Sequence, residues 1–504
     1  MLRFARPRSI NPLVWWDQSD PVRFQALIDY CKQDVLTERE LDCRVPELSP
    51  RERLIFELDH WINMAGLGID HRLVSELAYL TQVAQTHSAR GIAQLTGGQV
   101  RSLSQVAQLR DWLKAQGLDI PDLRRATVQT LLPQTPAGPA RTALQARLDA
   151  SRSSTAKLAS IASARSQDGR IRGTFQYYGA SRTGRWAGRR LQPQNLFRGS
   201  IKDVPAALKI IRAGAGPADL EMLFEDSALG VVASCLRSTI VARPDHRLVI
   251  ADFSQIEARV LAWLAGQQDA LDVFRAGKDI YVETARKIGS PNRQLGKVLT
   301  LACGFGMGHQ RFRETALGYG VSLDEDEAAE AVSAWREVNH HIVTFWWEGH
   351  RALMRVLRAG PGAAERVCFC TFIHKPGVLL IKLPSSRHLV YRHPRIEVND
   401  KGFDEFTYMG SLDGGWVLLR AWPGKIAEHV TQAVARDVMA EAMIQLNALP
   451  LIATIHDELI AEVSASQADR VLDRMLTTMR RPVPWAPGLP VDAAGFTVRR
   501  YQKG

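Results

Sequence analysis

The stretch at residues 247–266, RLVIADFSQIEARVLAWLAG, constrains the fold most, because it places a carboxylate at the end of a buried strand. Residues 248–251 form a short, continuous apolar run, which is typical of a strand covered on both faces. Asp252 ends that run, and Ser254 followed by Glu257 has the spacing of a capping box ahead of an apolar helix. The stretch alone leaves two interpretations open, namely an active-site carboxylate or ordinary turn and capping chemistry.

Charge points to a polyanionic partner. The 504 residues are enough for two or more subdomains, and 64 Lys and Arg against 53 Asp and Glu give a net charge of +11. Residues 165–198 hold eight arginines and one acid, Asp168, interleaved with aromatic residues such as Trp186. Arginine and aromatic groups on one stretch suit phosphate contact and base stacking, although a solvated basic surface is the alternative.

The six cysteines are scattered without a C-x-x-C pair, so we expect a reducing compartment and no structural metal. Cys368 and Cys370 lie in an alternating stretch, where both side chains are expected to share one face of a strand. No apolar run of 18 residues or more occurs, so we expect neither a transmembrane helix nor a membrane partner.

A second carboxylate motif lies near the C-terminal end. The sequence reads LIATI, HDE and LIAEV, so two apolar strands flank His456, Asp457 and Glu458. Adjacent acids beside buried strands cost desolvation and mutual repulsion unless a cation offsets them. If this hairpin neighbours the strand that ends in Asp252, the two carboxylates would hold a pair of divalent ions. Such a pair polarises an attacking hydroxyl and stabilises a leaving phosphate oxygen.

The third motif is RQLGKVLTLACGFGMG at residues 293–308. Arg293, Lys297, Leu301 and Phe305 recur every four residues, so all four are expected to line one broad helix face. Two cations at one end and a ring at the other suit a ligand with a polyphosphate and a base. An amphipathic surface helix is the alternative. The glycines at 304–308 do not follow a strand, which argues against a Rossmann site.

Together these residues resemble the family A DNA polymerases of the DNA polymerase I type, particularly the phage members. DFSQIEARV resembles the first palm motif, R-x-x-x-K with its aromatic and glycine resembles the fingers helix, and HDE resembles the second palm motif. Residues 175–196 resemble the segment along the primer-template minor groove, and VTQAVARD at 430–437 resembles the helix before the hairpin. The five motifs occur in family order over residues 170–465.

The resemblance implies a mixed, helix-rich α/β fold, a right-hand polymerase with an antiparallel palm sheet. The expected division is an exonuclease remnant at 1–48, palm entry at 49–85, thumb at 86–165, palm at 166–262, fingers at 263–399 and palm at 400–504. The implied activity is template-directed addition of dNTPs to a primer 3′-hydroxyl, with primer-template DNA and dNTPs as partners.

The resemblance also implies residue roles. Asp252 and Asp457 would bind two Mg²⁺ ions, for which Mn²⁺ can substitute, with Phe253 as a further metal ligand and Glu458 beside them. Lys297 would act on the pyrophosphate leaving group. The remaining nucleotide-binding residues are Arg293, Leu301, Phe305, Gln255 and Glu257, the last of which would exclude a 2′-hydroxyl. The primer-template contacts are Arg185, Gln194, Asn195, Gln432 and His456. The family usually carries Phe or Tyr at 301 and Tyr at 305.

Three rival functions remain. A single-subunit RNA polymerase would share the palm and the cationic helix, although Glu257 and Glu458 argue against it. A reverse transcriptase lacks this helix. A non-catalytic DNA-binding or replisome-scaffold protein would not need the carboxylates.

YCKQD, with Tyr30 and Asp34, resembles the last motif of a proofreading exonuclease. The two earlier acidic motifs have no room before it, so we predict no 3′ to 5′ exonuclease activity from this chain. A separate exonuclease or replisome proteins are candidate partners. The expected location is the cytoplasm of a bacterium or phage-infected host cell, without secretion.

Overall fold

The computed structural model describes residues 9–10, 12–150, 157–197, 199–412 and 414–502. The chain divides into two units, Met1–Phe56 and Glu57–Gly504. In the first unit lie β1 (Ser9–Ile10), β2 (Leu13–Val14), α1 (Trp16–Ser19) and α2 (Pro21–Arg44), and α3 (Pro50–Ala65) begins there. The Asp20 side chain caps α2 by accepting a hydrogen bond from the Arg23 N–H. Tyr30 and Asp34 both lie on α2 and are exposed.

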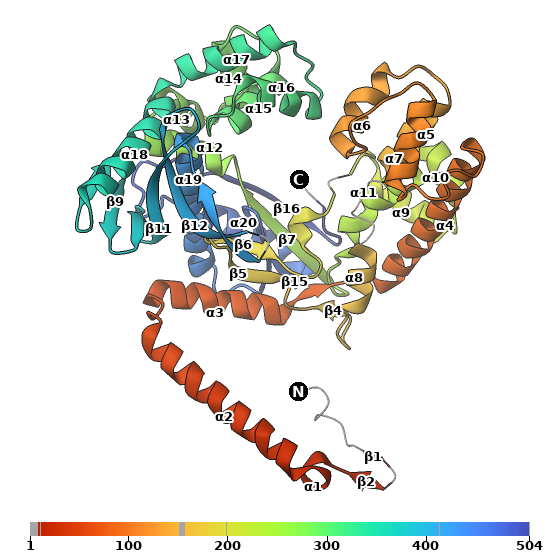
Figure 1. Cartoon of the computed structure of the whole chain (residues 1–504), viewed down its shortest axis with the longest axis horizontal. Helices are drawn as coiled ribbons and strands as arrows, with labels where there is room; N and C mark the ends of the chain where they lie inside the picture. Colours follow the sequence, from red (N-terminus) through yellow and green to blue (C-terminus); the bar gives the residue numbers. More distant parts are fainter. Residues whose placement is uncertain (1–8, 11, 151–156, 198, 413, 503–504) are drawn as a thin grey trace. The chain divides into compact units, whose positions relative to one another are not determined.

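A four-stranded antiparallel sheet forms the centre of the second unit, in the order β14-β15-β7-β16 (Figure 1). Its strands are β7 (His246–Phe253), β14 (Leu451–Ile455), β15 (Glu458–Ser464) and β16 (Ala493–Val498). Residues 248–251 are at most 1% exposed, as a strand covered on both faces requires. The buried strand is therefore confirmed. It continues one residue further than expected, through Phe253, because β16 pairs with β7 as far as that residue.

Helices cover this sheet and extend from it. α20 (Ala468–Met479) contacts β7 and β16, and α12 (Ile256–Ala265) packs on α19 (Pro423–Gln445). After α12 come α13 (Gln268–Arg275), α14 (Ile280–Lys287), α15 (Arg293–Cys303), α16 (His309–Gly318), α17 (Glu325–Val338) and α18 (His340–Ala359). The acidic run at 324–327 caps α17, with Asp324 and Glu327 forming a capping box.

A six-stranded antiparallel meander follows α18. It consists of β8 (Ala364–Val367), β9 (Cys370–Lys375), β10 (Val378–Lys382), β11 (His388–Val398), β12 (Asp404–Leu412) and β13 (Gly415–Arg420). The expectation for the two cysteines was wrong. Cys368 lies in the turn between β8 and β9 with φ of 49° and is exposed, whereas Cys370 is buried in β9. All six cysteines are free.

A helical arm consists of α4 (His71–Leu95), α5 (Val106–Ala115), α6 (Arg125–Leu131), α7 (Pro139–Ala150) and α8 (Lys157–Ser163). Residues from α4 to α7 build a hydrophobic cluster of their own, which includes Leu109, Trp112 and Leu144. In Figure 1 these helices lie on one side of β7 and α14 to α17 lie on the other. The arm therefore has a core independent of the central sheet.

Short elements connect the arm to the sheet. They are β3 (Leu67–Gly68), β4 (Arg170–Ile171), β5 (Phe175–Ala180), β6 (Arg185–Gly188), α9 (Val204–Arg212), α10 (Pro217–Phe224) and α11 (Ala228–Cys235). Arg170 in β4 is buried and donates a hydrogen bond of 2.8 Å to Glu462 in β15. None of the described helices is both long and apolar enough to cross a membrane.

Candidate active site

The two carboxylates that the sequence singled out lie at the ends of neighbouring strands. Asp252 is in β7, and the hairpin between β14 and β15 carries Asp457. The Phe253 N–H donates a hydrogen bond of 3.1 Å to the Asp457 carbonyl, and Asp252 stands directly opposite Glu458 in the register. The structure therefore brings together residues that are far apart in the sequence. Glu458 starts β15 and does not belong to the turn, so the polar connection is one residue shorter than expected.

Arg185 bridges two acids of this site. Its guanidinium donates a hydrogen bond of 2.6 Å to Glu257 and one of 3.1 Å to Asp457. Burial lowers the pKa of Arg185, but the two carboxylates raise it more, so its pKa lies above the usual value and the side chain stays charged. Arg436 on α19 holds the neighbouring backbone, because it is buried, donates to the Gly184 carbonyl at 3.1 Å and lies over the Trp186 ring.

The expected capping box at Ser254 and Glu257 is wrong. The residue that precedes α12 is Gln255, which has φ of 45° and makes no side-chain cap. The Glu257 carboxylate is directed to Arg185 instead. A glutamate three residues after a serine fits a capping box whether or not its carboxylate pairs with a distant arginine, so the sequence could not separate the two roles. Gln255 is exposed beside the carboxylate strand.

Four of the five predicted primer-template contacts, Arg185, Gln194, Asn195 and His456, lie in or beside the hairpin. Gln194 and Asn195 lie in the short helix Pro193–Asn195, and His456 Nε2 is 3.2 Å from the Gln194 carbonyl oxygen. The side-chain oxygen of Gln194 is buried and has no hydrogen-bond partner among the described residues. Gly188 makes room for Gln194, since a Cβ there would lie 2.5 Å from that oxygen. Gln432, on α19, contacts Glu428 at 3.4 Å.

The cationic helix is α15, and it is shorter than the pattern suggested. Asn292 caps it by accepting hydrogen bonds from the backbone N–H groups of Gln294 and Leu295. Arg293, Lys297 and Leu301 share one face, and Leu301 is 46% exposed. Arg293 donates a hydrogen bond of 2.7 Å to Asp279.

The four-residue spacing predicted that Phe305 lies on this helix. That prediction was wrong, because α15 ends at Cys303. It stands in the glycine-containing turn that follows, and its ring packs partly against the main core. The turn backbone approaches the start of α19 so closely that a Cβ at Gly424 would lie 2.1 Å from the Phe305 carbonyl oxygen. Gly424 is thus required for this approach.

The carboxylate pair has the donor chemistry of a site for a hard divalent ion. Among the described residues there is no group of three or more His, Cys, Asp or Glu side chains that could hold a metal. Mg²⁺, however, is usually bound by one or two carboxylates together with waters and substrate phosphates. Asp457 has a side chain that is 24% exposed, and Asp252 is half-buried, so both are within reach of such a ligand. The residues present fit Mg²⁺ or Mn²⁺ and lack soft ligands.

Two residues near the carboxylates were missed by sequence reasoning. Tyr501 and Arg237 are buried, and the Tyr501 hydroxyl is hydrogen-bonded to both Arg237 and Glu458. No spacing in the sequence marks either residue.

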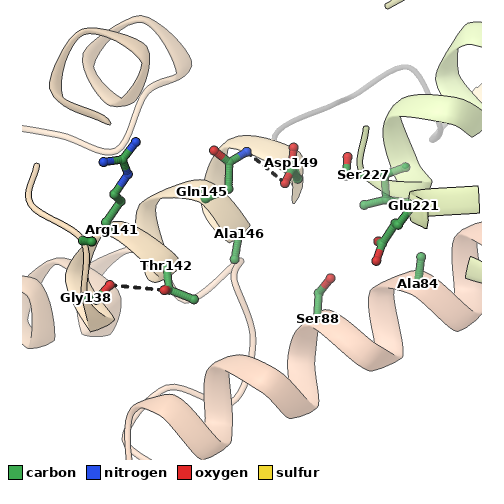
Figure 2. A pocket seen from close by; sticks show the side chains of 12 residues that line it. Ala84, Ser88, Gly138, Arg141, Thr142, Gln145, Ala146, Asp149, Glu221 and Ser227 are labelled. Carbon is green, nitrogen blue, oxygen red and sulfur yellow. Dashed lines mark hydrogen bonds between the residues drawn. The ribbon is translucent and has the colours of Figure 1, made fainter. Parts of the chain in front are cut away.

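A cavity of about 480 Å³ lies elsewhere, between α4, α7, α10 and α11 (Figure 2). Arg141, Asp149 and Glu221 are its charged lining residues, and Asp149 accepts a hydrogen bond of 3.2 Å from Gln145. None of the predicted site residues lines it. The cavity is therefore separate from the carboxylate site.

The comparisons with known proteins agree with one another. A family model described as DNA polymerase family A matches residues 127–352. A DNA polymerase of Bacillus phage SP02 is 33% identical over 502 residues, covering 96% of this chain and 76% of that protein. The DNA polymerase I of Lactococcus lactis subsp. lactis (strain IL1403) is 24% identical over 271 residues, which are 51% of this chain and 26% of that protein.

A solved structure gives the fold. The POL domain of Pol1 from M. smegmatis, in complex with DNA primer-template and dNTP, matches with a TM-score of 0.58 at 17% identity. The match covers 90% of this chain and 69% of that chain. The fold is thus that of a polymerase domain, which confirms the predicted mixed, helix-rich α/β class.

The chain belongs to DNA polymerase family A. It is accordingly a DNA-directed DNA polymerase, as predicted, rather than an RNA polymerase or a scaffold protein. Polymerases of this family use divalent metal ions.

Proposed function

We propose that the chain extends a primer on a template by two-metal nucleotidyl transfer at Asp252 and Asp457. The observation that carries the proposal is the antiparallel pairing of β7 with β15, which places both carboxylates at one edge of the sheet. Two bound Mg²⁺ ions would supply the charge that activates the primer 3′-hydroxyl and neutralises the triphosphate. Asp252, Asp457 and Phe253 are the proposed ligands, and Glu458 lies beside them.

The residues of α15 bind the incoming dNTP in this proposal. The primer 3′-oxygen forms a bond to the α-phosphorus, and the bond to pyrophosphate breaks. Arg293 and Lys297 neutralise the phosphates, and Lys297 donates toward the pyrophosphate. Arg293 is held by Asp279 in this structure, and a triphosphate would compete with that carboxylate for it. Leu301 and Phe305 would face the base and sugar, with Gln255 nearby.

The primer end would contact the polar residues around the hairpin. The buried, unpartnered oxygen of Gln194 supports this, because a buried acceptor without a donor is costly until a ligand satisfies it. Asn195, Gln432 and His456 complete this set, and Arg185 orients Glu257 and Asp457. Glu257 would exclude the 2′-hydroxyl and so select deoxyribose.

The division into subdomains is part of the proposal. Residues 49–85, 166–262 and 400–504 form the palm, 86–165 the thumb and 263–399 the fingers. The separate core of α4 to α7 supports the thumb, and the grouping of α14 to α17 supports the fingers. Residues 1–48 remain our candidate exonuclease remnant. The phage relative supports a location in the cytoplasm of a bacterium or phage-infected host cell.

Primer extension with Mg²⁺ and dNTPs tests the proposal. Asp252→Ala and Asp457→Ala should each lower the rate by roughly a thousandfold or more, since removing a group that stabilises transition-state charge has effects of this size. Binding of primer-template, measured by fluorescence anisotropy, should change little. Asp473→Ala, at an exposed position on α20, is the matched control and should extend normally. Full extension by either active-site variant would refute the proposal.

A further inference from the structure

Glu458 is a carboxylate in a place where a charge is expensive. It is 1% exposed, and it stands opposite Asp252 in the pairing of β15 with β7. Opposed residues of an antiparallel pair point to the same face of the sheet, so the two carboxylates are neighbours. Burying one carboxylate beside another is unfavourable unless hydrogen bonds offset the desolvation and repulsion. The orientation of Glu458 therefore depends on its donors.

Tyr501 is one of those donors. Its side chain is fully buried, with 0% exposure, and its hydroxyl is hydrogen-bonded to the Glu458 carboxylate. Arg237, itself 6% exposed, donates to the same hydroxyl at 3.1 Å. Because a guanidinium only donates, the Tyr501 hydroxyl accepts a hydrogen bond from Arg237 and donates one to the Glu458 carboxylate. Burial, together with the Glu458 and Asp252 carboxylates, raises the pKa of Tyr501, so the hydroxyl keeps its proton.

Both supporting residues are fixed by backbone contacts. The Tyr501 N–H donates to the Ile240 carbonyl at 2.9 Å, which ties the segment around Tyr501 to the one that follows Arg237. The Arg237 guanidinium also donates to the carbonyls of Leu196, at 2.6 Å, and Phe197, at 3.0 Å. Those carbonyls directly follow Gln194 and Asn195. A rigid, buried chain of contacts thus runs from this segment through Arg237 and Tyr501 to Glu458.

We propose that Tyr501, held in place by Arg237, is a positioning residue for polymerisation that fixes the Glu458 carboxylate beside Asp252. This inference rests on the proposed function, because it assumes that the carboxylate edge of the sheet is the catalytic centre. Tyr501 is too deeply buried to contact substrate directly and acts through Glu458. Without the Tyr501 hydroxyl, the Glu458 carboxylate would lose a hydrogen-bond donor. It would then no longer be fixed in its position beside Asp252.

A double-mutant cycle tests this role. Tyr501→Phe removes only the hydroxyl and should lower kcat for single-nucleotide addition by about tenfold, with the KM for dNTP and the Kd for primer-template within about twofold of wild type. Glu458→Ala should also lower kcat. In the Glu458→Ala background, Tyr501→Phe should have an effect smaller than about twofold, because its target is absent. Mn²⁺ binding to the same four proteins, followed by electron paramagnetic resonance without dNTP, gives a second readout.

A loss in either readout that disappears in the Glu458→Ala background supports the proposal. Effects that multiply in the double mutant would overturn it, as would Tyr501→Phe leaving both kcat and Mn²⁺ affinity within twofold of wild type. Tyr391→Phe is the matched control. It removes the hydroxyl of another fully buried tyrosine, which lies in β11 of the meander and is 3.0 Å from His429 on α19. This variant should leave kcat unchanged.

Failure of this inference and failure of the proposed function are distinguishable. If Asp252→Ala is inactive while Tyr501→Phe behaves as wild type, the two-metal assignment stands and the positioning role falls. If Asp252→Ala extends primers normally, the proposed function itself is wrong, whatever Tyr501 does. Thermal melting of each variant guards against misfolding, since a Tyr501→Phe protein that melts as wild type but adds nucleotides slowly cannot owe its defect to lost structure.

Discussion

Phe253 and Asp457 are joined by a backbone hydrogen bond of 3.1 Å, from the N–H of the first to the carbonyl of the second. This bond continues the pairing of β7 with β15 beyond its last paired residues, Asp252 and Glu458. The pairing register sets the spacing of the carboxylates, because a slip by one residue would turn Asp252 to the opposite face of the sheet. The apolar residues of β7 and β15 thus hold the site in place.

Arg185 should be needed for catalysis because it connects Glu257 to Asp457. We expect Arg185→Ala to lower kcat by roughly 10- to 100-fold, since it leaves two partly buried carboxylates without their shared cation. Arg185→Lys, whose ammonium lacks the fork of two donor groups, should be intermediate. Single-turnover addition at saturating primer-template measures this. Arg189→Ala, at an exposed position on the same segment, is the control. Equal rates for Arg185→Ala and Arg189→Ala would contradict the prediction.

Lys297 should act on the leaving group rather than on DNA binding. Removing a cation that neutralises transition-state charge typically costs about 100-fold or more, so Lys297→Ala should slow nucleotide addition by that amount. The Kd for primer-template should stay the same. Lys287→Ala on the neighbouring helix α14 is a matched control, because that lysine is paired with Asp269. A Lys297→Ala enzyme with a near-normal rate in rapid-quench measurements would remove the leaving-group role.

Glu257 should select the sugar. We expect Glu257→Ala to raise the kcat/KM for an rNTP relative to the matching dNTP by roughly 10-fold or more, because it opens space where a 2′-hydroxyl would lie. Glu257→Gln keeps the volume and should retain most of the selectivity. An unchanged ratio of the two kcat/KM values in Glu257→Ala would show that other residues discriminate, with Leu301 the next candidate because it is exposed on the same helix as Lys297.

The parts of the site that could be predicted were those with a local signature. A continuous apolar run that ends in an acid predicted β7 and Asp252, because a strand buried on both faces consists of consecutive apolar residues. The HDE connection between two such runs predicted the hairpin. The neighbour relation of the two strands was a conditional expectation, and only β-pairing in the folded chain could establish it.

Contacts between distant segments could not be predicted. Glu257 looked like a capping residue because nothing near it in the sequence reveals that Arg185 is its partner. Phe305 fitted a helical spacing, but the approach of Gly424 to its backbone belongs to a turn. Tyr501 and Arg237 have no motif at all, since their roles come from burial against Glu458. Family resemblance supplied the functional roles, whereas residue patterns supplied the elements.

Acid should destabilise the fold through His429. Burial lowers the pKa of His429 to about 3, with Lys425 and Arg182 adding to the effect, and Nδ1 lies 3.0 Å from the Tyr391 hydroxyl. The folded state therefore keeps this histidine neutral, whereas the unfolded chain takes up a proton as the pH falls below about 6.5. Since the unfolded state binds more protons, stability is fully present above that pH and is lost as the pH falls toward 3.

Urea unfolding at pH 7 and pH 5 measures this loss. Each pH unit below the unfolded pKa costs up to about 1.4 kcal/mol, so wild type should lose about 2 kcal/mol more than His429→Gln between the two pH values. Glutamine retains an acceptor for Tyr391 but does not titrate, and every other ionisable group is common to both proteins. Parallel stability curves for wild type and His429→Gln would show that the buried histidine does not govern the acid sensitivity. A steeper acid loss in wild type would locate it at the packing of α19 against the meander, through the Tyr391 and His429 contact.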